Sequence, residues 1–478
     1  MTLLYSRCSR NNDRPARLPL HSQGCVMTAI SEAVSQAAAT FGGQLLAPAD
    51  AGYDEARQVH NGLVDKRPAL IARCHGTADV VDAIGLARKL GLKVAVRGGG
   101  HSVAGRATID DGLMIDLAPM KGILVDPKAR TVRAQGGVLW RELNRETQLH
   151  GLATTGGVVS TTGIAGLTLG GGLGWLMCKH GLALDNLLSA EIVTAEGKVL
   201  RASAEENPDL FWAVRGGGGN FGVAASLEYR LHAVGPTIIG GLIAYPFEQA
   251  REVLRFFRET TQSMPDDMMV VAGLIHAPDG AKLAAMVVAH FGAYAAAEAA
   301  VQPIQQFGTP ALSQIGPISY CQLNSMLDGA YPRGALNYWK SSFLAGLSDD
   351  AIERLVDCFG KCPTPMGQLL LEHFHGAVSR VPVEATAFPH RLEGCNLVVL
   401  SEWMDPAISD RCIEWARESY STMGRFLGSG RYVNYLGEDE PGDPAAAAYG
   451  VNYRRLQEIK RKYDPENFFQ INLNIRPA

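Results

Sequence analysis

The first half of the chain alternates short apolar runs with one clear amphipathic segment. Between residues 77 and 90 the apolar positions recur every three or four residues, which predicts a helix with one buried face. Short strands are predicted at 93–96, 112–116, 122–125 and 131–135, and a second helix at 138–149. A hairpin around Glu196-Gly197, a short helix opened by Asn207-Pro208 and a strand at 223–231 complete this half. The pattern is typical of an α+β protein.

The pattern changes near residues 234–236. Longer helices now alternate with strands: helices are predicted at 247–262, 295–306 and 349–359, and strands at 268–275, 368–375 and 396–403. We therefore expect two domains, residues 28–235 and 236–416, the second an antiparallel sheet backed by helices. A C-terminal segment, residues 417–478, is expected to complete the first domain.

Length and composition support this division. A chain of 478 residues exceeds what one hydrophobic core normally organises. Apolar residues make up 47% and charged residues 19%, which excludes intrinsic disorder for the chain as a whole. The net charge of -4 gives no electrostatic reason to expect nucleic acid or an anionic membrane as a partner.

Cysteine usage and the N-terminal residues bear on the compartment. The nine cysteines are scattered rather than arranged as a disulfide framework, so we expect a cytoplasmic protein. Cys358 and Cys362 could share a helix face, but no second pair completes a zinc set, and we expect no metal. Residues 1–27 are polar and lack the apolar run of a secretory signal. They are expected to be a disordered or misassigned leader, with Met27 as a candidate start.

Glycine is the exception in the composition. Fifty-three residues are glycine, about 11% against a usual share of about 7%, and they gather in three clusters, 98–105, 156–174 and 216–222. Loops without side chains let successive backbone N–H groups point at phosphate oxygens, so the clusters favour a bound diphosphate over mere turns.

One cluster fits the spacing of a nicotinamide dinucleotide fingerprint. Residues 217–222 read Gly-Gly-Gly-Asn-Phe-Gly, which satisfies G-x-G-x-x-G. That fingerprint should follow a strand and open a helix. Here a predicted helix precedes it and a predicted strand follows, so the context argues against a nicotinamide dehydrogenase.

Four motifs together resemble a known family. They are Val-Arg-Gly-Gly-Gly-His-Ser at 96–102, Ser-Thr-Thr-Gly-Ile-Ala-Gly-Leu-Thr-Leu-Gly-Gly-Gly-Leu-Gly at 160–174, Lys-His-Gly-Leu-Ala-Leu-Asp-Asn at 179–186, and the Asn-Pro-Asp-Leu-Phe-Trp-Ala-Val-Arg segment from residue 207 with the glycines that follow. These are similar to the FAD-linked oxidases of the vanillyl-alcohol oxidase and p-cresol methylhydroxylase type, and best to the berberine bridge enzyme-like branch. The likeness is dense from about residue 70 to 234, returns at 431–475 and is thin between.

The resemblance implies the cofactor and how it is held. In that family the histidine of the Gly-Gly-His-Ser loop is joined to the 8α-methyl of FAD, and His101 matches it. Some relatives add a cysteinyl link where Val159 stands, so no such link is expected, and Cys178 is expected to serve packing. The expected FAD-binding residues are Arg97, Gly98, Gly99, Gly100, His101, Ser102, Gly157, Val159, Thr161, Thr162, Gly163, Gly166, Gly222, Val223, Asn434 and Asn472.

Five residues are candidates for the catalytic chemistry. Tyr432 and Tyr435 resemble a tyrosine pair near the flavin, the second being the candidate base, and a straight strand would place their rings on opposite faces. A tyrosine needs help to act as a base because its ordinary pKa is about 10. In the predicted strand at 368–375, Glu372 lies on one face and His373 and His375 on the other. One face should line the site, and the pattern does not say which.

The expected activity is that of a flavoprotein oxidase. Such an enzyme takes a hydride from a C–H bond beside O or N to flavin N5 and reoxidises with O2, which yields H2O2. A dehydrogenase with another acceptor and a non-catalytic flavin or ligand carrier are the alternatives. We expect a small-molecule substrate and O2 as partners, leave a homodimer open, and expect no nucleic acid and no membrane. Sugars, alkaloids, phenols and amines all stay open as substrates.

Overall fold

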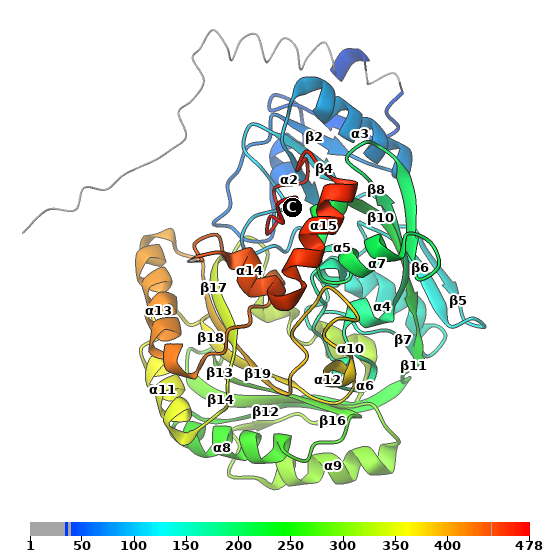
Figure 1. The fold of residues 1–478 in the computed structure, drawn as a ribbon. Coiled ribbons are helices and arrows are strands. Elements are labelled where there is room, and N and C mark those ends of the chain that lie inside the picture. The colour runs from blue at the N-terminus through cyan, green and yellow to red at the C-terminus, as the bar shows by residue number, and fades with distance from the viewer. Residues whose placement is uncertain (1–33, 37–39, 441) are drawn as a thin grey trace, which may run out of the picture.

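The computed structural model describes residues 34–36, 40–440 and 442–478. The expected leader, residues 1–27, lies outside these residues. Two structural units face one another, with the C-terminal helices beside the first, as Figure 1 shows. None of the helices in the described part of the chain has the length and apolarity needed to cross a membrane.

The first unit begins with a small sheet that carries the first glycine loop. Its strands lie in the order β1 (Gln44–Leu46), β2 (Leu70–Arg73), β4 (Leu113–Asp116) and β3 (Val94–Arg97). β4 pairs in parallel with both β2 and β3, and α3 (Thr77–Leu90) packs its apolar face on this sheet. The predicted helix and strands are confirmed, and β3 leads directly into residues 98–102. A short helix, α2 (Tyr53–Arg57), precedes β2.

A second, antiparallel sheet carries the third glycine cluster, whereas the second cluster follows β7 (Leu152–Ala153), which pairs with β11 (His232–Ala233) in a separate two-stranded sheet. The strands of the second sheet lie in the order β5 (Ile123–Asp126), β6 (Thr131–Gln135), β10 (Val223–Arg230), β8 (Leu187–Val193) and β9 (Val199–Ser203). The predicted hairpin is β8 and β9, and the strand expected after the third cluster is β10. The connecting elements are α4 (Trp140–Gln148), β7, α5 (Ile164–Leu169), α6 (Met177–His180), η1 (Ala183–Asn186), α7 (Pro208–Val214), η2 (Gly218–Phe221) and β11.

The second unit is one large antiparallel sheet backed by helices, as expected. Its strands lie in the order β15 (Leu312–Ser313), β12 (Thr237–Pro246), β14 (Lys282–His290), β13 (Met268–His276), β18 (Gln368–Phe374), β19 (Gly394–Trp403) and β17 (Leu336–Phe343), with β16 (Gly316–Ser319) paired to β12. The helices α8 (Ala250–Thr261), α9 (Tyr294–Gln306), α11 (Asp349–Gly360) and α13 (Ser409–Thr422) cover its outer face (Figure 1). Shorter helices of this unit are η3 (Phe247–Gln249), α10 (Tyr320–Ser325), η4 (Asp328–Ala330), α12 (Ala377–Arg380), η5 (Pro406–Ile408) and η6 (Gly424–Phe426).

The two faces of β19 have different neighbours. Leu397 and Val399 pack with Trp415 of α13 in the outer core. Val398 and Leu400 point the other way and pack with Tyr331. Because side chains alternate along a strand, the inner face of the large sheet is turned toward the first unit and can line a site between the two.

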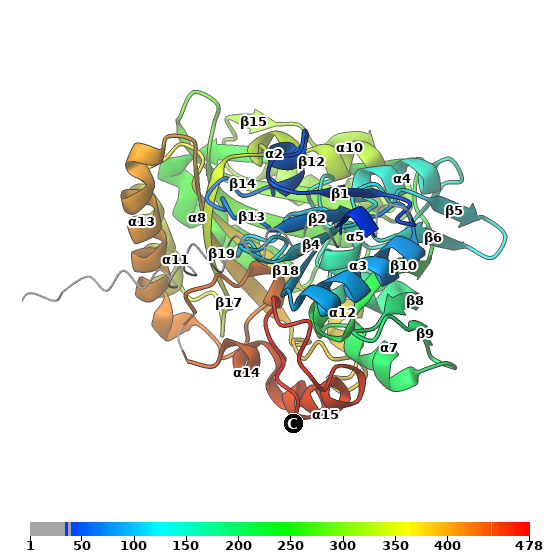
Figure 2. The ribbon, with the colours of Figure 1, turned by 90° about the horizontal axis from the view of Figure 1, so that it is seen from above.

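The C-terminal segment returns to the first unit. It contains η7 (Val433–Tyr435), α14 (Pro444–Tyr449), η8 (Gly450–Asn452) and α15 (Tyr453–Tyr463), and Figure 2 shows α15 beside α7. Lys460 is fully buried there and donates hydrogen bonds to Asp464 and to the carbonyls of Asn220 and Phe469. A boundary at residue 417 would divide α13, whose buried side chains belong to the outer core of the large sheet.

Candidate functional site

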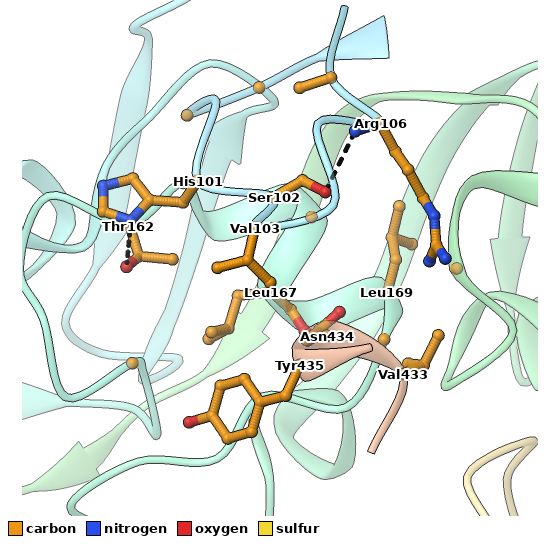
Figure 3. Close-up of a pocket in the computed structure, with 18 of the residues that line it drawn as sticks. His101, Ser102, Val103, Arg106, Thr162, Leu167, Leu169, Val433, Asn434 and Tyr435 are labelled. Carbon is orange, nitrogen blue, oxygen red and sulfur yellow. Dashed lines mark hydrogen bonds between the residues drawn. The ribbon is translucent and has the colours of Figure 1, made fainter. Parts of the chain in front are cut away.

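A cavity lies between the two units and gathers most of the expected residues (Figure 3). The expected residues that line it are Gly98, Gly99, Gly100, His101, Ser102, Gly157, Val159, Thr162, Gly163, Gly166, Gly222, Val223, Asn434, Asn472, Tyr435 and Glu372. All three glycine clusters contribute to its wall. Five further expected residues, Arg97, Thr161, Tyr432, His373 and His375, are not among its lining residues.

Glycine is required where the first two clusters meet. A Cβ atom on Gly99 would lie 2.3 Å from the backbone nitrogen of Gly163, and one on Gly163 would lie 2.3 Å from the nitrogen of Gly99. Both distances are far below van der Waals contact, so neither position can carry a side chain without moving the other loop. Gly100, with φ 73°, then turns the chain toward His101.

The end of the second cluster is closely packed against other segments of the chain. A Cβ on Gly174 would lie 1.6 Å from the carbonyl oxygen of Gly156, and one on Gly170 would lie 2.1 Å from Oδ1 of Asn434. The N–H groups of Gly172 and Leu173 donate to the hydroxyl of Tyr432, at 3.1 and 3.4 Å. This part of the cluster therefore packs against the C-terminal segment, although Gly170 and Leu173 also line the cavity.

Arg97 supports the first glycine loop from outside the cavity lining. Its guanidinium donates to both carboxylate oxygens of Asp116, at 2.9 and 3.1 Å, and to the carbonyl of Gln58 at 3.0 Å. Arg97 and Asp116 are register partners at the ends of β3 and β4. This buried, bidentate pair holds the point where β3 turns into the glycine loop.

His101 is held in one orientation inside the cavity. Its ring stacks on that of His60, with centroids 3.9 Å apart, and its Nε2 lies 3.0 Å from the hydroxyl oxygen of Thr161. Burial, and after it the neighbouring His60 and Arg333, lower the pKa of His101 to about 3. The imidazole is therefore neutral at physiological pH and keeps a nitrogen lone pair.

The two tyrosines do not lie on a straight strand, and the expected separation of their rings is wrong. Residues 433–435 form the short helix η7, which brings Tyr432 and Tyr435 together with ring centroids 4.8 Å apart. Tyr432 is 1% exposed, and its hydroxyl oxygen also accepts from Asn434 at 2.8 Å. Tyr432 thus holds η7 against the second glycine cluster, whereas the ring of Tyr435 lines the cavity (Figure 3).

Tyr435 is paired with a carboxyl group. Its hydroxyl donates to Oε1 of Glu372 at 2.9 Å, and the side-chain amide of Asn396 donates to Oε2 at 2.9 Å. Burial raises the pKa of Glu372, while those two bonds offset part of the shift. Burial, and then the neighbouring Glu372, raise the pKa of Tyr435 well above 10. Of the two groups, Glu372 thus loses its proton at the lower pH and is the one that can be ionised to accept a proton.

His373 and His375 lie on the opposite face of β18. The ring of His373 contacts Phe257 of α8, and its Nδ1 lies 3.1 Å from Nδ1 of His375. His375 reaches the carbonyl of Pro265 through Nε2, at 3.3 Å. The strand alternation predicted from the sequence places Glu372 toward the cavity and these histidines toward the outer helices.

Several lining residues were not predicted from the sequence. Arg106 follows the first glycine loop closely enough that its position could have been noticed. The aromatic residues Tyr331, Trp339 and Tyr449 come from segments without any motif. Nothing in the local sequence of those three separates them from ordinary core aromatics.

The comparisons with known proteins agree with this geometry. A family model described as FAD binding domain matches residues 68–203, and one described as berberine and berberine like matches residues 431–476. The (R)-6-hydroxynicotine oxidase of Paenarthrobacter nicotinovorans is 32% identical over 447 residues, 91% of this chain and 97% of that protein. An FAD-linked oxidoreductase of Dictyostelium discoideum is 31% identical over 417 residues, 86% of this chain and 89% of that protein.

The chain belongs to the FAD-linked, berberine bridge enzyme-like oxidoreductases. Solved structures agree: that of 6-hydroxy-D-nicotine oxidase from Arthrobacter nicotinovorans has a TM-score of 0.85 at 30% identity, and covers 92% of this chain and 99% of its own. Glucooligosaccharide oxidase from Acremonium strictum has a TM-score of 0.83 at 25% identity, and covers 94% and 99%.

The residues present fit FAD. The backbone of all three glycine clusters lines the cavity. The buried guanidinium of Arg106, near Tyr449, also lines it and donates a hydrogen bond of 3.3 Å to the carbonyl of Gly437. A guanidinium has five donors, so several can still reach an anionic group such as a diphosphate. In Figure 3 the side chains of His101 and Arg106 lie on opposite sides of the view. Among the residues that the structure describes, no group of three or more His, Cys, Asp or Glu could hold a metal ion.

The contact between the glycine loops yields a prediction. Gly99→Ala should lower both flavin content and stability, because its Cβ would lie 2.3 Å from Gly163 and overpacking typically costs about 1–3 kcal/mol. Flavin absorbance per protein and chemical denaturation measure the two effects. Gly85→Ala, on the open side of α3 with no atom within 4 Å, is the control and should keep full flavin. Normal flavin content in Gly99→Ala would contradict the packing argument.

Proposed function

We propose that this protein is an FAD-dependent oxidase with its flavin bound covalently through His101. It removes a hydride from a C–H bond beside O or N of a small organic substrate and passes the electrons to O2, giving H2O2. The observation that carries the proposal is the hydrogen-bonded pair of Tyr435 and Glu372 in the cavity wall. A buried carboxyl group that is hydrogen-bonded to a phenol in a cavity wall can accept a proton through that phenol.

The covalent link is supported by the state of His101. A bond to the 8α-methyl requires a neutral imidazole with a lone pair directed at one place. Burial keeps His101 neutral, and stacking on His60 with the contact to Thr161 limits its rotation. The glucooligosaccharide oxidase structure carries a flavin described as 6-S-cysteinyl, 8α-N1-histidyl FAD. Val159 lines the cavity where we align the cysteine, so a single histidyl bond is proposed.

The proton path follows from the relative acidity of the two groups, because Glu372 ionises more readily than Tyr435. The bound flavin supplies the hydride acceptor. Tyr435 takes the hydroxyl or amine proton of the substrate while its own proton passes to Glu372. Asn396 holds the second carboxylate oxygen and so orients the acceptor. In this arrangement Tyr435 never has to exist as a free phenolate, which its raised pKa would make costly.

Oxidase activity is proposed from the relatives. The hydroxynicotine relative and a xylooligosaccharide oxidase of Thermothelomyces thermophilus, 28% identical over 459 residues, are both named oxidases. Their names cover an alkaloid and a sugar, so they leave the substrate of this protein open. A dehydrogenase that uses another electron acceptor is the alternative.

Peroxide release distinguishes the two. With a substrate found by screening alcohols and amines for anaerobic bleaching of the flavin, the protein should release close to one H2O2 per substrate oxidised under air. A coupled peroxidase assay measures the ratio. Rapid bleaching combined with reoxidation too slow to sustain turnover in air would favour the dehydrogenase.

The covalent bond is tested by denaturation. Acid-precipitated wild-type protein should stay yellow, because a covalent link survives loss of the fold that otherwise retains FAD. His101→Ala should release all of its flavin into the supernatant. Complete release of flavin from the wild type would refute the link but leave the proposed hydride transfer open.

The proton path is tested by anaerobic stopped-flow reduction. Tyr435→Phe and Glu372→Gln should each slow flavin reduction by about 10²- to 10⁴-fold, the usual loss when a general base is removed. The double variant should lose little more than either single one, because residues that act as a unit are not additive.

His375→Gln is the matched control for this experiment. It changes a polar residue of the same strand segment on the opposite face, and it should reduce within about threefold of the wild type. If Tyr435→Phe keeps the wild-type rate, or if His375→Gln slows as much as Glu372→Gln, the assignment of the pair is wrong.

A further inference from the structure

Glu402 is a buried carboxyl that the proposed mechanism does not use. Its residue is 0% exposed, and neither carboxyl oxygen has a hydrogen-bond partner among the described residues. Burial alone raises the pKa of Glu402 to about 8. A buried polar group without a partner costs free energy, so its presence calls for an explanation. The group is mostly neutral at pH 7, which lowers that cost.

Strand geometry places Glu402 behind the wall of the cavity. It follows Val398 and Leu400 at alternating positions of β19, on the face turned to the cavity, and those two residues line it. Tyr331, which also lines the cavity, lies close enough to Glu402 and Glu372 for both carboxyls to raise its pKa, after the larger effect of burial. Tyr331 therefore lies close both to the cavity and to Glu402.

The groups around Glu402 provide no positive charge. Tyr331, from the turn before β17, lies close enough to Glu402 for the carboxyl to raise its pKa. Arg333 of the same turn donates to the carbonyl of Gln58, and Arg417 of α13 pairs with Asp439. The register partner of Glu402 on β17 is the uncharged Asn337. Lys340, also on β17, is held by ion pairs with Asp439 and Glu440. In Figure 3 the guanidinium of Arg106 and the hydroxyl of Tyr435 lie on opposite sides of the labelled residues.

The rest of this wall is aromatic and aliphatic. The large sheet and the turn before it line the cavity with Tyr331, Trp339, Leu370, Glu372, Val398 and Leu400. Trp339 lies 5.6 Å from Tyr435 and 6.4 Å from Tyr331, between ring centroids. A sugar would need many hydrogen-bonding side chains, and these six offer few. Aromatic faces beside carboxyl groups are instead the usual surroundings of a bound ammonium group.

We propose that Glu402 is a specificity-determining residue, which selects a small substrate carrying a positively charged amine among Tyr331, Trp339 and Tyr435. A cation in this position supplies the missing countercharge, so Glu402 ionises when the ligand binds. The inference rests on the proposed function, because it names the substrate class of the same site.

Amine oxidation is consistent with the roles given to the neighbouring residues. The ammonium nitrogen loses one proton to Glu372 through Tyr435, and the adjacent carbon loses a hydride to the flavin, which is reduced. The organic product is an iminium ion. Its positive charge equals that of the bound substrate, so the aromatic faces and Glu402 can stabilise both.

The test uses ligands that cannot be oxidised. Phenyltrimethylammonium is a permanent cation, and tert-butylbenzene is its neutral isostere. In the flavin-loaded wild type the cation should bind at least about tenfold more tightly at pH 7, measured by perturbation of the flavin spectrum. Its binding should release close to one proton, measured by calorimetry in buffers of different ionisation enthalpy. The release should fade by about pH 9.5, where Glu402 is already ionised.

Glu402→Gln is the matched variant, because glutamine resembles the protonated acid. It should reduce the preference for the cation about tenfold and remove most of the proton release. Equal affinity of the wild type for both ligands would overturn the proposal, and so would an unchanged preference and proton release in Glu402→Gln. If that variant fails to hold flavin, the wild-type release decides: no release at pH 7 refutes the role of Glu402. None of these outcomes involves turnover, so each is independent of the peroxide and stopped-flow tests of the proposed function.

Discussion

The structure depends on a backbone contact that only glycine permits. Gly99 and Gly163 approach so closely that a Cβ on either would lie within 2.3 Å of the other chain segment. This contact joins the loop that follows β3 to the loop that opens α5, and His101 leaves the first loop beside Thr161 and Thr162 of the second. The cavity wall is therefore a consequence of backbone packing before any side chain binds a cofactor.

A similar constraint holds the segment that carries Tyr435. Gly170 leaves room for Asn434, and Gly172 donates its N–H to Tyr432. Tyr435, three residues after Tyr432, is carried into the cavity by the short helix η7 and meets Glu372 from the opposite unit. The proposed proton-accepting pair is thus assembled from two distant parts of the chain, each held by its own surroundings. In this proposal a carboxyl group replaces the cation that a lone tyrosine would need.

Much of this was predictable from the sequence, and the remainder has physical reasons. The glycine clusters, His101 and the placement of Glu372 opposite the two histidines follow from local pattern and from family motifs. Which face of the strand lines the cavity was left open by the sequence. The placement of Tyr432 beside Tyr435 was not predicted. A single helical turn replaces the expected strand, and it brings the two rings together where a strand would have separated them. Tyr331 and Trp339 lack any local signal, since their role arises only when the large sheet packs against the first unit. Glu402 could not be distinguished from a surface glutamate until its burial was known.

The pH dependence of anaerobic flavin reduction tests the central claim, that Glu372 receives the substrate proton through Tyr435, most directly. Glu372 must be ionised to accept a proton, so the limiting rate should be full above its pKa and fall as the pH drops through it. Burial raises that pKa above its ordinary value of 4.5, so the rate should begin to fall at a higher pH than it would with a free carboxyl group. Glu372→Gln should reduce its flavin slowly, and its rate should not show this pH-dependent decrease. A wild-type rate that instead rises only above about pH 10, with no step in the acidic range, would show that a phenolate is the base and would contradict the account.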